Sequence, residues 1–255
     1  MILERCPVTG VRKAGDGMHV LAFTSRAIGT SIRPGQFLNI RVQEGIDPLL
    51  RRPFSAYRVA ADAVEIIFNV VGRGTSALRD KRPGDVLDVL GPLGVPFGYD
   101  APGFETAVLI GGGLGVAPLP ILTGALRGAG KSVLTFLGGR TAGFVAGEYL
   151  ENLHVATDDG SKGFHGTVVD LARNTLSATP PRRPKIFACG PTAMLRAVAG
   201  FALAAGIPCE VSLEGPMGCG IGICQGCPVE LAGTGKRYAL MCKDGPVFDS
   251  RTIKL

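Results

Sequence analysis

The sequence predicts a multidomain α+β protein with three parts: an antiparallel β-barrel, an α/β domain built on a parallel sheet, and a small cysteine-rich module. Three observations lead to this prediction. Short strand-like segments fill the first hundred residues, strand and helix patterns alternate from about residue 105, and four cysteines cluster near the end. A chain of 255 residues is long enough for two ordinary domains and a small module. We expect their boundaries at residues 1–101, 102–210 and 211–255.

The first part is predicted to be a barrel because its strand-like segments are short and are separated by turn residues. Such turns include Gly-Asp-Gly at residues 15–17 and Arg-Pro-Gly at residues 33–35. Many short strands at this spacing are typical of an antiparallel barrel or sandwich. One helical turn is expected at residues 75–80. The expected strands lie near residues 4–13, 17–25, 36–43, 54–60, 63–71 and 85–90.

The second part is predicted to be an α/β domain because buried-strand patterns alternate with helix-length stretches. This alternation indicates a parallel sheet covered by helices on both faces. A short hairpin is expected at about residues 228–240, in the cysteine-rich module. The expected strands of the sheet are 106–110, 132–137, 154–157, 185–188 and 209–213, and the expected helices are 116–128, 166–176 and 192–205.

The charge and hydropathy of the chain argue against two classes of partner. The formal net charge is +6, but Lys and Arg are dense only at residues 51–52 and 180–185, without interleaved aromatic residues. Nucleic-acid binding needs a concentrated basic stripe, so we expect no nucleic-acid partner. No apolar run is long enough to span a bilayer, and the first residues lack the layout of a signal peptide. We therefore expect no membrane anchor and a cytoplasmic protein.

The cysteine-rich module has the spacing of an iron–sulfur site. Its cysteines are Cys219, Cys224, Cys227 and Cys242, with four, two and fourteen residues between them. Spacings of four and two followed by a distant fourth cysteine are typical of plant-type [2Fe–2S] ligands. The neighbouring glycines let the backbone take positive φ and direct amide N–H groups at the sulfur atoms. The alternative is a structural zinc site, but zinc modules usually repeat a C-x2-C pair, which occurs here once.

A glycine-rich turn, Gly-Gly-Gly-Leu-Gly-Val-Ala-Pro at residues 111–118, follows an expected strand and precedes an expected helix. Glycines there permit close approach of the backbone to a pyrophosphate, and the helix presents its N-terminal amides. The turn departs from the G-x-G-x-x-G fingerprint, because Pro118 replaces the third glycine and no acidic residue ends the next strand. We predict a nucleotide site, with a plain tight turn as the alternative. The assigned residues are Gly111, Gly112, Gly113 and Gly115.

Two further segments follow expected parallel strands at the edge where α/β sheets place their ligands. Asp158 follows the third strand, and Cys189, Gly190 and Pro191 follow the fourth. We assign all four residues to the nucleotide site. The alternatives are ordinary turn chemistry for Asp158 and a small buried hydrophobe for Cys189.

Two barrel segments have the groups needed to hold a phosphate or a flat ring. The segment at residues 51–57 offers cations, aromatic rings and a hydroxyl, and residues 72–76 open the expected helical turn with amides and hydroxyls. The alternatives are an ordinary strand with an arginine at its edge and a helix capped by Thr75. The assigned residues are Arg52, Pro53, Phe54, Ser55, Gly72, Gly74 and Thr75.

The predicted nucleotide and cluster sites together require a third redox group. A nicotinamide nucleotide delivers a hydride, which carries two electrons, whereas one [2Fe–2S] cluster accepts electrons singly. No amino-acid side chain here exchanges electrons in both ways, but a flavin does. We therefore assign the two barrel segments to a flavin.

The order of barrel, nucleotide domain and ferredoxin-like cysteines resembles the ferredoxin–NADP reductase superfamily, and within it the electron-transfer subunits of dihydroorotate dehydrogenase B. The resemblance rests on the four cysteines and on residues 52–55, 111–118, 157–161, 189–195 and 242–248, and it covers the chain nearly end to end. It implies that the flavin is FAD.

The resemblance also implies roles for individual residues. Arg52 would contact the FAD pyrophosphate, Ser55 would lie near the isoalloxazine ring, and Gly72 and Thr75 would hold phosphate oxygens. NAD⁺ would be the co-substrate. Its pyrophosphate would face Gly113 and Gly115, and its nicotinamide would lie beside Cys189 and Gly190.

The partner implied by the resemblance is an FMN-containing dihydroorotate dehydrogenase catalytic subunit, in a heterotetramer of two chains of each kind. Electrons would run from dihydroorotate to the FMN, then to the cluster, to FAD and to NAD⁺, as a step of pyrimidine biosynthesis. Three other functions fit parts of the pattern. They are an electron-transfer subunit of a ferredoxin- or hydrogenase-type NAD(P)H oxidoreductase, a flavin reductase with diffusible acceptors, and a zinc-stabilised nucleotide-binding module without redox activity.

Overall fold

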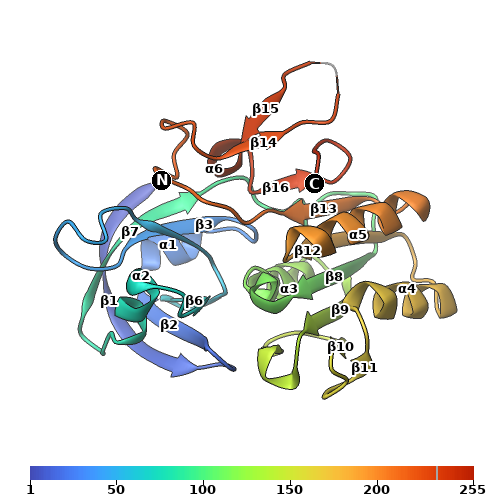
Figure 1. The fold of residues 1–255 in the computed structure, drawn as a ribbon, viewed down its shortest axis with the longest axis horizontal. Helices are drawn as coiled ribbons and strands as arrows, with labels where there is room; N and C mark the ends of the chain where they lie inside the picture. Colours follow the sequence, from blue (N-terminus) through green and yellow to red (C-terminus); the bar gives the residue numbers. More distant parts are fainter. Residues whose placement is uncertain (234) are drawn as a thin grey trace.

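The computed structural model describes residues 1–233 and 235–255 of the chain. Two seven-stranded sheets lie side by side, and a smaller C-terminal module lies over their junction (Figure 1). Within these described residues, no helix is long and apolar enough to cross a membrane.

The first sheet is antiparallel and curves into the barrel. Its elements are β1 (Ile2–Lys13), β2 (Met18–Thr24), α1 (Arg26–Ser31), β3 (Phe37–Arg41), β4 (Arg52–Ser55), β5 (Arg58–Ala60), β6 (Ala63–Asn69), α2 (Arg73–Arg79) and β7 (Val86–Leu93). The strand order is β4-β3-β7-β1-β2-β6-β5. Successive side chains of a strand point to opposite faces, and in β1 this places Cys6 and Val8 in the core between exposed neighbours.

The second sheet is parallel except for one edge strand. Its elements, with the intervening helices, are β8 (Thr106–Gly112), α3 (Leu119–Gly128), β9 (Ser132–Gly139), β10 (Leu153–Thr157), β11 (Phe164–His165), α4 (Val168–Ala178), β12 (Pro184–Cys189), α5 (Thr192–Ala204), β13 (Cys209–Ser212) and β16 (Val247–Asp249). The strand order is β11-β10-β9-β8-β12-β13-β16. Two short 3₁₀ turns accompany them, η1 (Gly113–Val116) and η2 (Ala142–Phe144).

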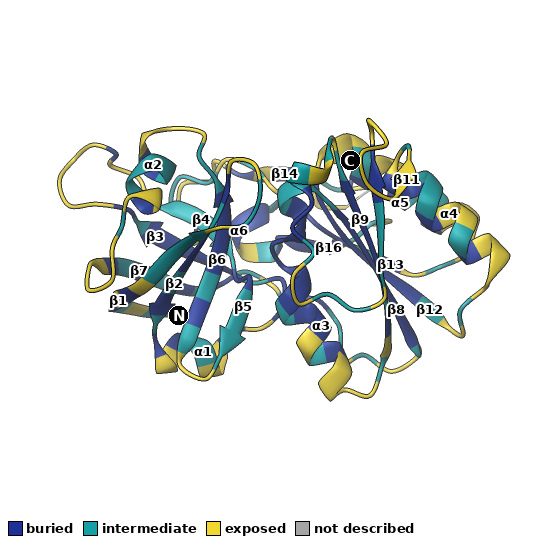
Figure 2. Cartoon of the chain, turned by 90° about the horizontal axis from the view of Figure 1, so that it is seen from below, coloured by how far each residue is buried: buried dark blue, intermediate teal, exposed yellow. Residues whose placement is uncertain are grey.

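Helices cover both faces of the second sheet, as the alternation of elements predicts. Val108 and Ile110 of β8 pack with residues of α4 and α5, whereas Ala107 and Leu109 pack with α3. Figure 2 shows the dark blue strands of this sheet between helices whose outer faces are exposed.

The C-terminal module contains the hairpin strands β14 (Pro228–Glu230) and β15 (Tyr238–Leu240) and the short helix α6 (Met241–Asp244). The chain then enters β16, which pairs antiparallel with β13 of the α/β sheet. Met241, Cys242 and Phe248 belong to the same buried cluster as residues of α4 and α5. The module is therefore anchored to the α/β domain by both a strand and a shared core.

The predicted fold class is confirmed, and the differences concern short elements. The strand expected at 54–60 is two strands, β4 and β5, separated by the fully buried Ala56 and Tyr57. The helix expected from residue 116 begins at Leu119, because the 3₁₀ turn η1 comes first. Four short elements were not predicted, since a hydrophobic period does not show over two to six residues. They are α1, β11, α6 and β16.

Candidate cofactor and electron-transfer site

The glycine turn lies at the carboxyl edge of the parallel sheet, where the chain leaves β8. β8 has β9 on one side and β12 on the other, so the order of strands reverses at this point and leaves a crevice for a ligand. Gly113 has a φ of +55°, which residues with a side chain rarely adopt. A Cβ on Gly115 would lie 2.0 Å from the carbonyl oxygen of Cys189. The turn can therefore pack against the end of β12 only because Gly115 has no side chain.

A cavity of about 680 Å³ opens at this edge. Four residues of the predicted nucleotide site line it: Gly112, Gly113, Asp158 and Pro191. The other four are buried residues that do not line it: Gly111, Gly115, Cys189 and Gly190. The structure thus brings all three predicted segments to one place, and half of their residues face the space that a ligand would fill.

Two arginines that were not among the predicted site residues also line this cavity. The guanidinium of Arg140 lies 4.8 Å from the ring centroid of Phe144, and Arg173 forms an ion pair with Asp170 at 3.3 Å. Arginine groups of this kind suit the phosphates of a nucleotide.

A second cavity, of about 240 Å³, lies where the three parts of the chain meet. Phe54 and Ser55 come from the barrel, Leu114 and Ala117 from the glycine turn and its following residues, and Glu214 from the C-terminal module. A planar group bound here would touch all three parts at once.

A third cavity, of about 370 Å³, forms a groove beside α2. Arg52, Gly72, Gly74 and Thr75 line it, and a Cβ on Gly74 would lie 3.4 Å from Nε of Arg52. The N-cap of α2 is Gly72 rather than Thr75, whose hydroxyl instead accepts hydrogen bonds from the N–H groups of Val71 and Gly72 at 2.9 and 3.2 Å. An arginine and a helix start therefore face one another across this groove.

These three cavities adjoin one another, because neighbouring cavities share lining residues. Val71 and Thr75 line both the groove and the 240 Å³ cavity, and Asn69 lines both the 240 Å³ cavity and the 680 Å³ cavity. Oδ1 of Asn69 is buried and has no hydrogen-bond partner among the described residues. A buried acceptor without a donor is unfavourable, and a ligand reaching this junction would supply a donor.

Glu214 and Cys189 meet behind the 240 Å³ cavity. The Cys189 thiol donates to Oε1 of Glu214 over 3.8 Å. Burial, followed by the nearby Glu214 carboxylate, raises the pKa of Cys189 well above its usual value. The Glu214 side chain is accessible from the cavity, but protein surrounds it on its other sides, and this desolvation raises the pKa of Glu214.

The four predicted ligand cysteines lie in two pairs. Sγ of Cys227 is 3.3 Å from Sγ of Cys242, and both residues are buried. Sγ of Cys219 accepts hydrogen bonds from the backbone N–H groups of Cys224 at 3.4 Å and Ile221 at 3.5 Å. Among the described residues, no three His, Cys, Asp or Glu side chains are close enough to hold a metal ion by themselves.

The residues around these pairs fit an iron–sulfur cluster. The N–H groups of Cys224 and Ile221 lower the pKa of Cys219 to about 6, which favours the thiolate that ligates iron. Burial and the adjacent Cys227 thiol raise the pKa of Cys242 to about 12, so that this buried pair needs a positive centre to ionise. A Cβ on Gly218 would lie 3.3 Å from Sγ of Cys224, so the glycine keeps that sulfur accessible.

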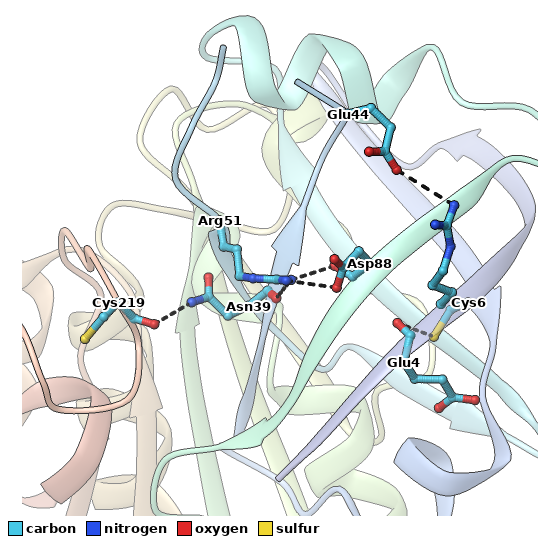
Figure 3. Close-up of polar contacts among 8 residues, drawn as sticks. Glu4, Cys6, Asn39, Glu44, Arg51, Asp88 and Cys219 are labelled. Carbon is cyan, nitrogen blue, oxygen red and sulfur yellow. Dashed lines mark hydrogen bonds and ion pairs between the residues drawn. The ribbon is translucent and has the colours of Figure 1, made fainter. Parts of the chain in front are cut away.

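Sequence reasoning missed three polar residues of this region: Asn39, Asn69 and Glu214. Figure 3 shows Asn39 between Cys219 and Arg51, with its Nδ2 donating to the Cys219 carbonyl oxygen at 3.0 Å. Its signal in the sequence is a polar residue within the apolar run Phe-Leu-Asn-Ile at residues 37–40. Asn69 and Glu214 carry no such signal, because Asn69 lies near the end of one expected strand and Glu214 directly follows another.

A fourth cavity, of about 640 Å³, includes Arg58, Tyr149 and Arg127 in its lining. Both of these arginines already pair with carboxylates: Arg58 with Glu65 and Arg127 with Glu151. It contains none of the predicted site residues.

Comparisons with known proteins agree with this geometry. Residues 214–254 match the family model described as the iron–sulfur cluster binding domain of dihydroorotate dehydrogenase B. The chain is 39% identical over 259 residues to the dihydroorotate dehydrogenase B (NAD(+)) electron transfer subunit of Bacillus caldolyticus, covering 99% of this chain and 98% of that protein. It is 36% identical over 251 residues to the subunit of the same name from Desulforamulus reducens, covering 95% of each.

Solved structures give the same picture of the fold. A structure of an NADH-dependent reduced ferredoxin-NADP oxidoreductase matches with a TM-score of 0.86 and 30% identity, covering 98% of this chain and 89% of that one. A ferredoxin NADP⁺ reductase from Neisseria gonorrhoeae with bound FAD and NADP matches with a TM-score of 0.66 and 16% identity, covering 80% of this chain and 92% of that one, and shows the shared fold alone.

Proposed function

The chain belongs to the family of dihydroorotate dehydrogenase B (NAD(+)) electron-transfer subunits, and on this premise we propose which of its residues hold the cofactors and which partner it serves. It is an electron-transfer subunit of an NAD-dependent oxidoreductase, it uses FAD, an iron–sulfur cluster and NAD, and it works with a catalytic partner subunit.

The observation that carries the proposal is that the three cavities adjoin one another. A dinucleotide flavin needs a site for its ring and another for its pyrophosphate, and the 240 Å³ cavity and the groove beside α2 meet at Val71 and Thr75. A nicotinamide nucleotide must bring its ring to the flavin, and the 680 Å³ cavity reaches the 240 Å³ cavity at Asn69.

We assign FAD to the 240 Å³ cavity and the groove beside α2, the two cavities lined by barrel residues of the predicted flavin site. Phe54 and Ser55 would border the flavin ring, and Arg52 would donate charge-assisted hydrogen bonds to the pyrophosphate. Gly74 leaves room for that guanidinium. The full assigned set is Arg52, Pro53, Phe54, Ser55, Gly72, Gly74 and Thr75.

NAD is assigned to the 680 Å³ cavity at the carboxyl edge of the parallel sheet. Gly112 and Gly113 would present backbone to its pyrophosphate, and Asp158 and Pro191 also line this cavity. The other four assigned residues do not line the cavity but let the glycine turn and the end of β12 pack closely against each other. They are Gly111, Gly115, Cys189 and Gly190.

The proposed cluster ligands are Cys219, Cys224, Cys227 and Cys242. When bound, the cluster would supply one-electron transfer, and FAD would combine two such electrons with a proton as the hydride that NAD⁺ accepts. The protein would contribute the four thiolates and the N–H groups directed at Cys219. It also brings the C-terminal module close to the proposed flavin cavity, because Glu214 and Met217 line that cavity.

The proposed partner is an FMN-containing catalytic subunit that oxidises dihydroorotate, in a heterotetramer of two chains of each kind. The cluster loop (residues 218–227) suits such a partner because Ile221 and Ile223, both between the ligands Cys219 and Cys224, are exposed, and neighbouring exposed apolar side chains favour a protein contact. Clustered thiols ligate metal in a reducing compartment, so we place the complex in the cytoplasm.

The experiment that tests the cofactor assignment is quantification of iron, sulfide and flavin in the anaerobically purified chain, with a visible spectrum. We expect about two iron, two sulfide and one FAD per chain. Zinc without flavin would contradict the proposal. Addition of dihydroorotate with the partner subunit, or of reduced ferredoxin in its place, then identifies the electron donor by which one reduces the FAD.

A further inference from the structure

Asn39 lies in β3, which pairs with the predicted flavin segment in β4, and its side chain is hydrogen-bonded to the cluster loop. Its Nδ2 donates to the Cys219 carbonyl oxygen over 3.0 Å, although the two residues lie 180 positions apart in sequence. In the sheet, Asn39 stands directly opposite Pro53 of β4. Among the described residues, no other hydrogen bond links the barrel to residues 218–227. Asn39 therefore forms a direct polar contact between the cluster loop and the barrel strand that pairs with β4.

The chemistry of this contact fixes the orientation of the amide. A backbone carbonyl only accepts hydrogen bonds, so the NH₂ group of Asn39 must face Cys219. Oδ1 then points elsewhere, and it is buried without a hydrogen-bond partner among the described residues. The side chain is 1% exposed, and its strand neighbours Leu38 and Ile40 are apolar. An apolar residue would avoid this unpaired buried acceptor but would leave the Cys219 carbonyl oxygen without its donor, so the contact with Cys219 is what accounts for asparagine here.

The backbone of Asn39 is itself held firmly. Arg51 donates to the carbonyl oxygen of Asn39 at 3.3 Å, to that of Asp88 at 2.9 Å and to the Asp88 carboxylate at 2.9 Å. Figure 3 shows this guanidinium reaching from the loop before β4 to both strands. Arg51 thus ties β3 to β7 at the point from which the Asn39 side chain extends.

The cluster loop is shaped to receive the amide. Gly220 has a φ of +75°, and a Cβ at this position would lie 2.5 Å from Nδ2 of Asn39. The amide therefore occupies the space that a side chain at residue 220 would need. The next residue is Ile221, whose N–H is one of the two directed at Cys219 Sγ. The peptide that Asn39 holds is therefore adjacent to the peptide that donates to the sulfur.

We propose that Asn39 is a positioning residue for the [2Fe–2S] cluster, fixing the peptide after Cys219 so that the N–H groups of Ile221 and Cys224 stay directed at the Cys219 sulfur. This inference rests on the proposed function, because it takes Cys219 as a cluster ligand. Hydrogen bonds to a ligand sulfur stabilise the reduced, more negative cluster. Loss of the Asn39 contact loosens them, lowers the reduction potential of the cluster and opens the loop.

The test compares three variants of the full-length chain: Asn39→Leu, Asn39→Asp and Thr135→Val. Asn39→Leu removes both the donor and the orphan acceptor while keeping the number and branching of the side-chain heavy atoms, and Asn39→Asp keeps the shape but has no N–H to donate at neutral pH. Thr135→Val is the matched control, because Oγ1 of Thr135 is also buried without a hydrogen-bond partner but lies in β9, away from the cluster loop. The readouts are the cluster's midpoint potential, its electron paramagnetic resonance spectrum when reduced, iron loss to a chelator and flavin content.

Both Asn39 variants are expected to have a lower potential, a changed resonance spectrum and about tenfold faster iron loss, the factor that one buried hydrogen bond of about 1.4 kcal/mol gives. The flavin content of both Asn39 variants should stay at the wild-type level. Thr135→Val should match wild type in midpoint potential, resonance spectrum, iron loss and flavin content. Complete loss of the cluster from an Asn39 variant that retains FAD also supports the proposal. If Asn39→Leu fails to fold, iron loss and the resonance spectrum of Asn39→Asp decide, because its carboxylate lowers the potential by charge alone.

Wild-type potential, spectrum and iron loss in the Asn39 variants would overturn the positioning role while leaving the proposed function intact. A wild-type chain without iron and sulfide would instead contradict the proposed function itself, and that result is obtained before any variant is compared.

Discussion

Arg52 lies in the groove beside α2, with its guanidinium against Gly74 and one N–H group donating to the Leu50 carbonyl oxygen at 2.6 Å. A phosphate in this groove would accept the remaining N–H groups in charge-assisted bonds. Arg52→Ala should therefore weaken FAD retention about tenfold or more. Flavin absorbance after gel filtration measures this. Arg26→Ala, on α1 and outside the cavities, should retain full flavin, and equal flavin in both variants would contradict the assignment of Arg52.

Glu214 gives the stability of the chain a specific pH dependence. Desolvation raises its pKa above the ordinary value of 4.5, so the folded chain keeps this proton after the unfolded chain has lost it. As pH rises above 4.5, the free energy of unfolding therefore decreases. The stabilising contribution of Glu214 is lost progressively and is gone once the pH has passed the folded pKa of Glu214.

Glu214→Gln carries no titrating proton, so its stability should fall less than that of wild type over the same rise in pH. Glu214→Asp, which keeps a carboxyl group, should retain most of the dependence. Urea unfolding of the chain at about pH 5 and about pH 8 measures the difference. Parallel profiles for wild type and Glu214→Gln would show that Glu214 is as well solvated in the folded chain as in the unfolded one.

At the scale of elements, the turn between β8 and α3 depends on one absent side chain. A Cβ at Gly115 would lie 2.0 Å from the Cys189 carbonyl oxygen. The backbones of Gly115 and Cys189 are both buried, so neither can shift aside without cost. Gly115→Ala should therefore lower the free energy of unfolding by about 3 kcal/mol and weaken NAD binding.

Gly124→Ala is the matched control for Gly115→Ala. Gly124 lies within α3, a Cβ there would meet nothing within 4 Å, and alanine favours a helix over glycine by about 1 kcal/mol. This variant should be as stable as wild type or more so. Equal stability of the two alanine variants would show that the turn and the end of β12 are not packed as described.

Elements with a clear period or a distinct turn were predictable from the sequence. The strands of the barrel, the alternation from β8 to β13 and the glycine turn each depend on residues close together in the chain, and each was found. β16 was not predictable, because its three residues become a strand only by pairing with β13, about forty residues earlier. The split between β4 and β5 likewise depends on burial of Tyr57, which the local sequence does not show.

The sequence indicated the segments of the candidate site but not that the cavities they line adjoin one another. Spacing identified the four cysteines, and residue type identified Arg52 and the glycines. The contacts that join these segments are long-range: Asn39 meets Cys219 across 180 positions, and Glu214 meets Cys189 across 25. Neither Asn39 nor Glu214 belongs to a recognisable short pattern, so only the folded chain reveals them.

At the scale of the whole molecule, the three parts are arranged so that the proposed cofactor sites adjoin one another. The C-terminal module lies over the junction of barrel and α/β domain, and the same cavity is lined by residues of all three parts (Figure 1). β16 anchors the module to one sheet and Asn39 ties its cluster loop to the other. The module can therefore stay fixed relative to both cofactor sites when a partner binds its exposed loop.

The most direct test of this arrangement is dihydroorotate-driven NADH formation by the complex of the catalytic subunit with the Cys224→Ser variant. Cys224 is exposed on the cluster loop, and serine removes one thiolate ligand without adding bulk. The account predicts that this complex retains FAD and still oxidises NADH with an artificial acceptor, but forms no NADH from dihydroorotate. NADH formation at the wild-type rate would contradict it, because electrons would then reach NAD⁺ without passing through the four-cysteine cluster.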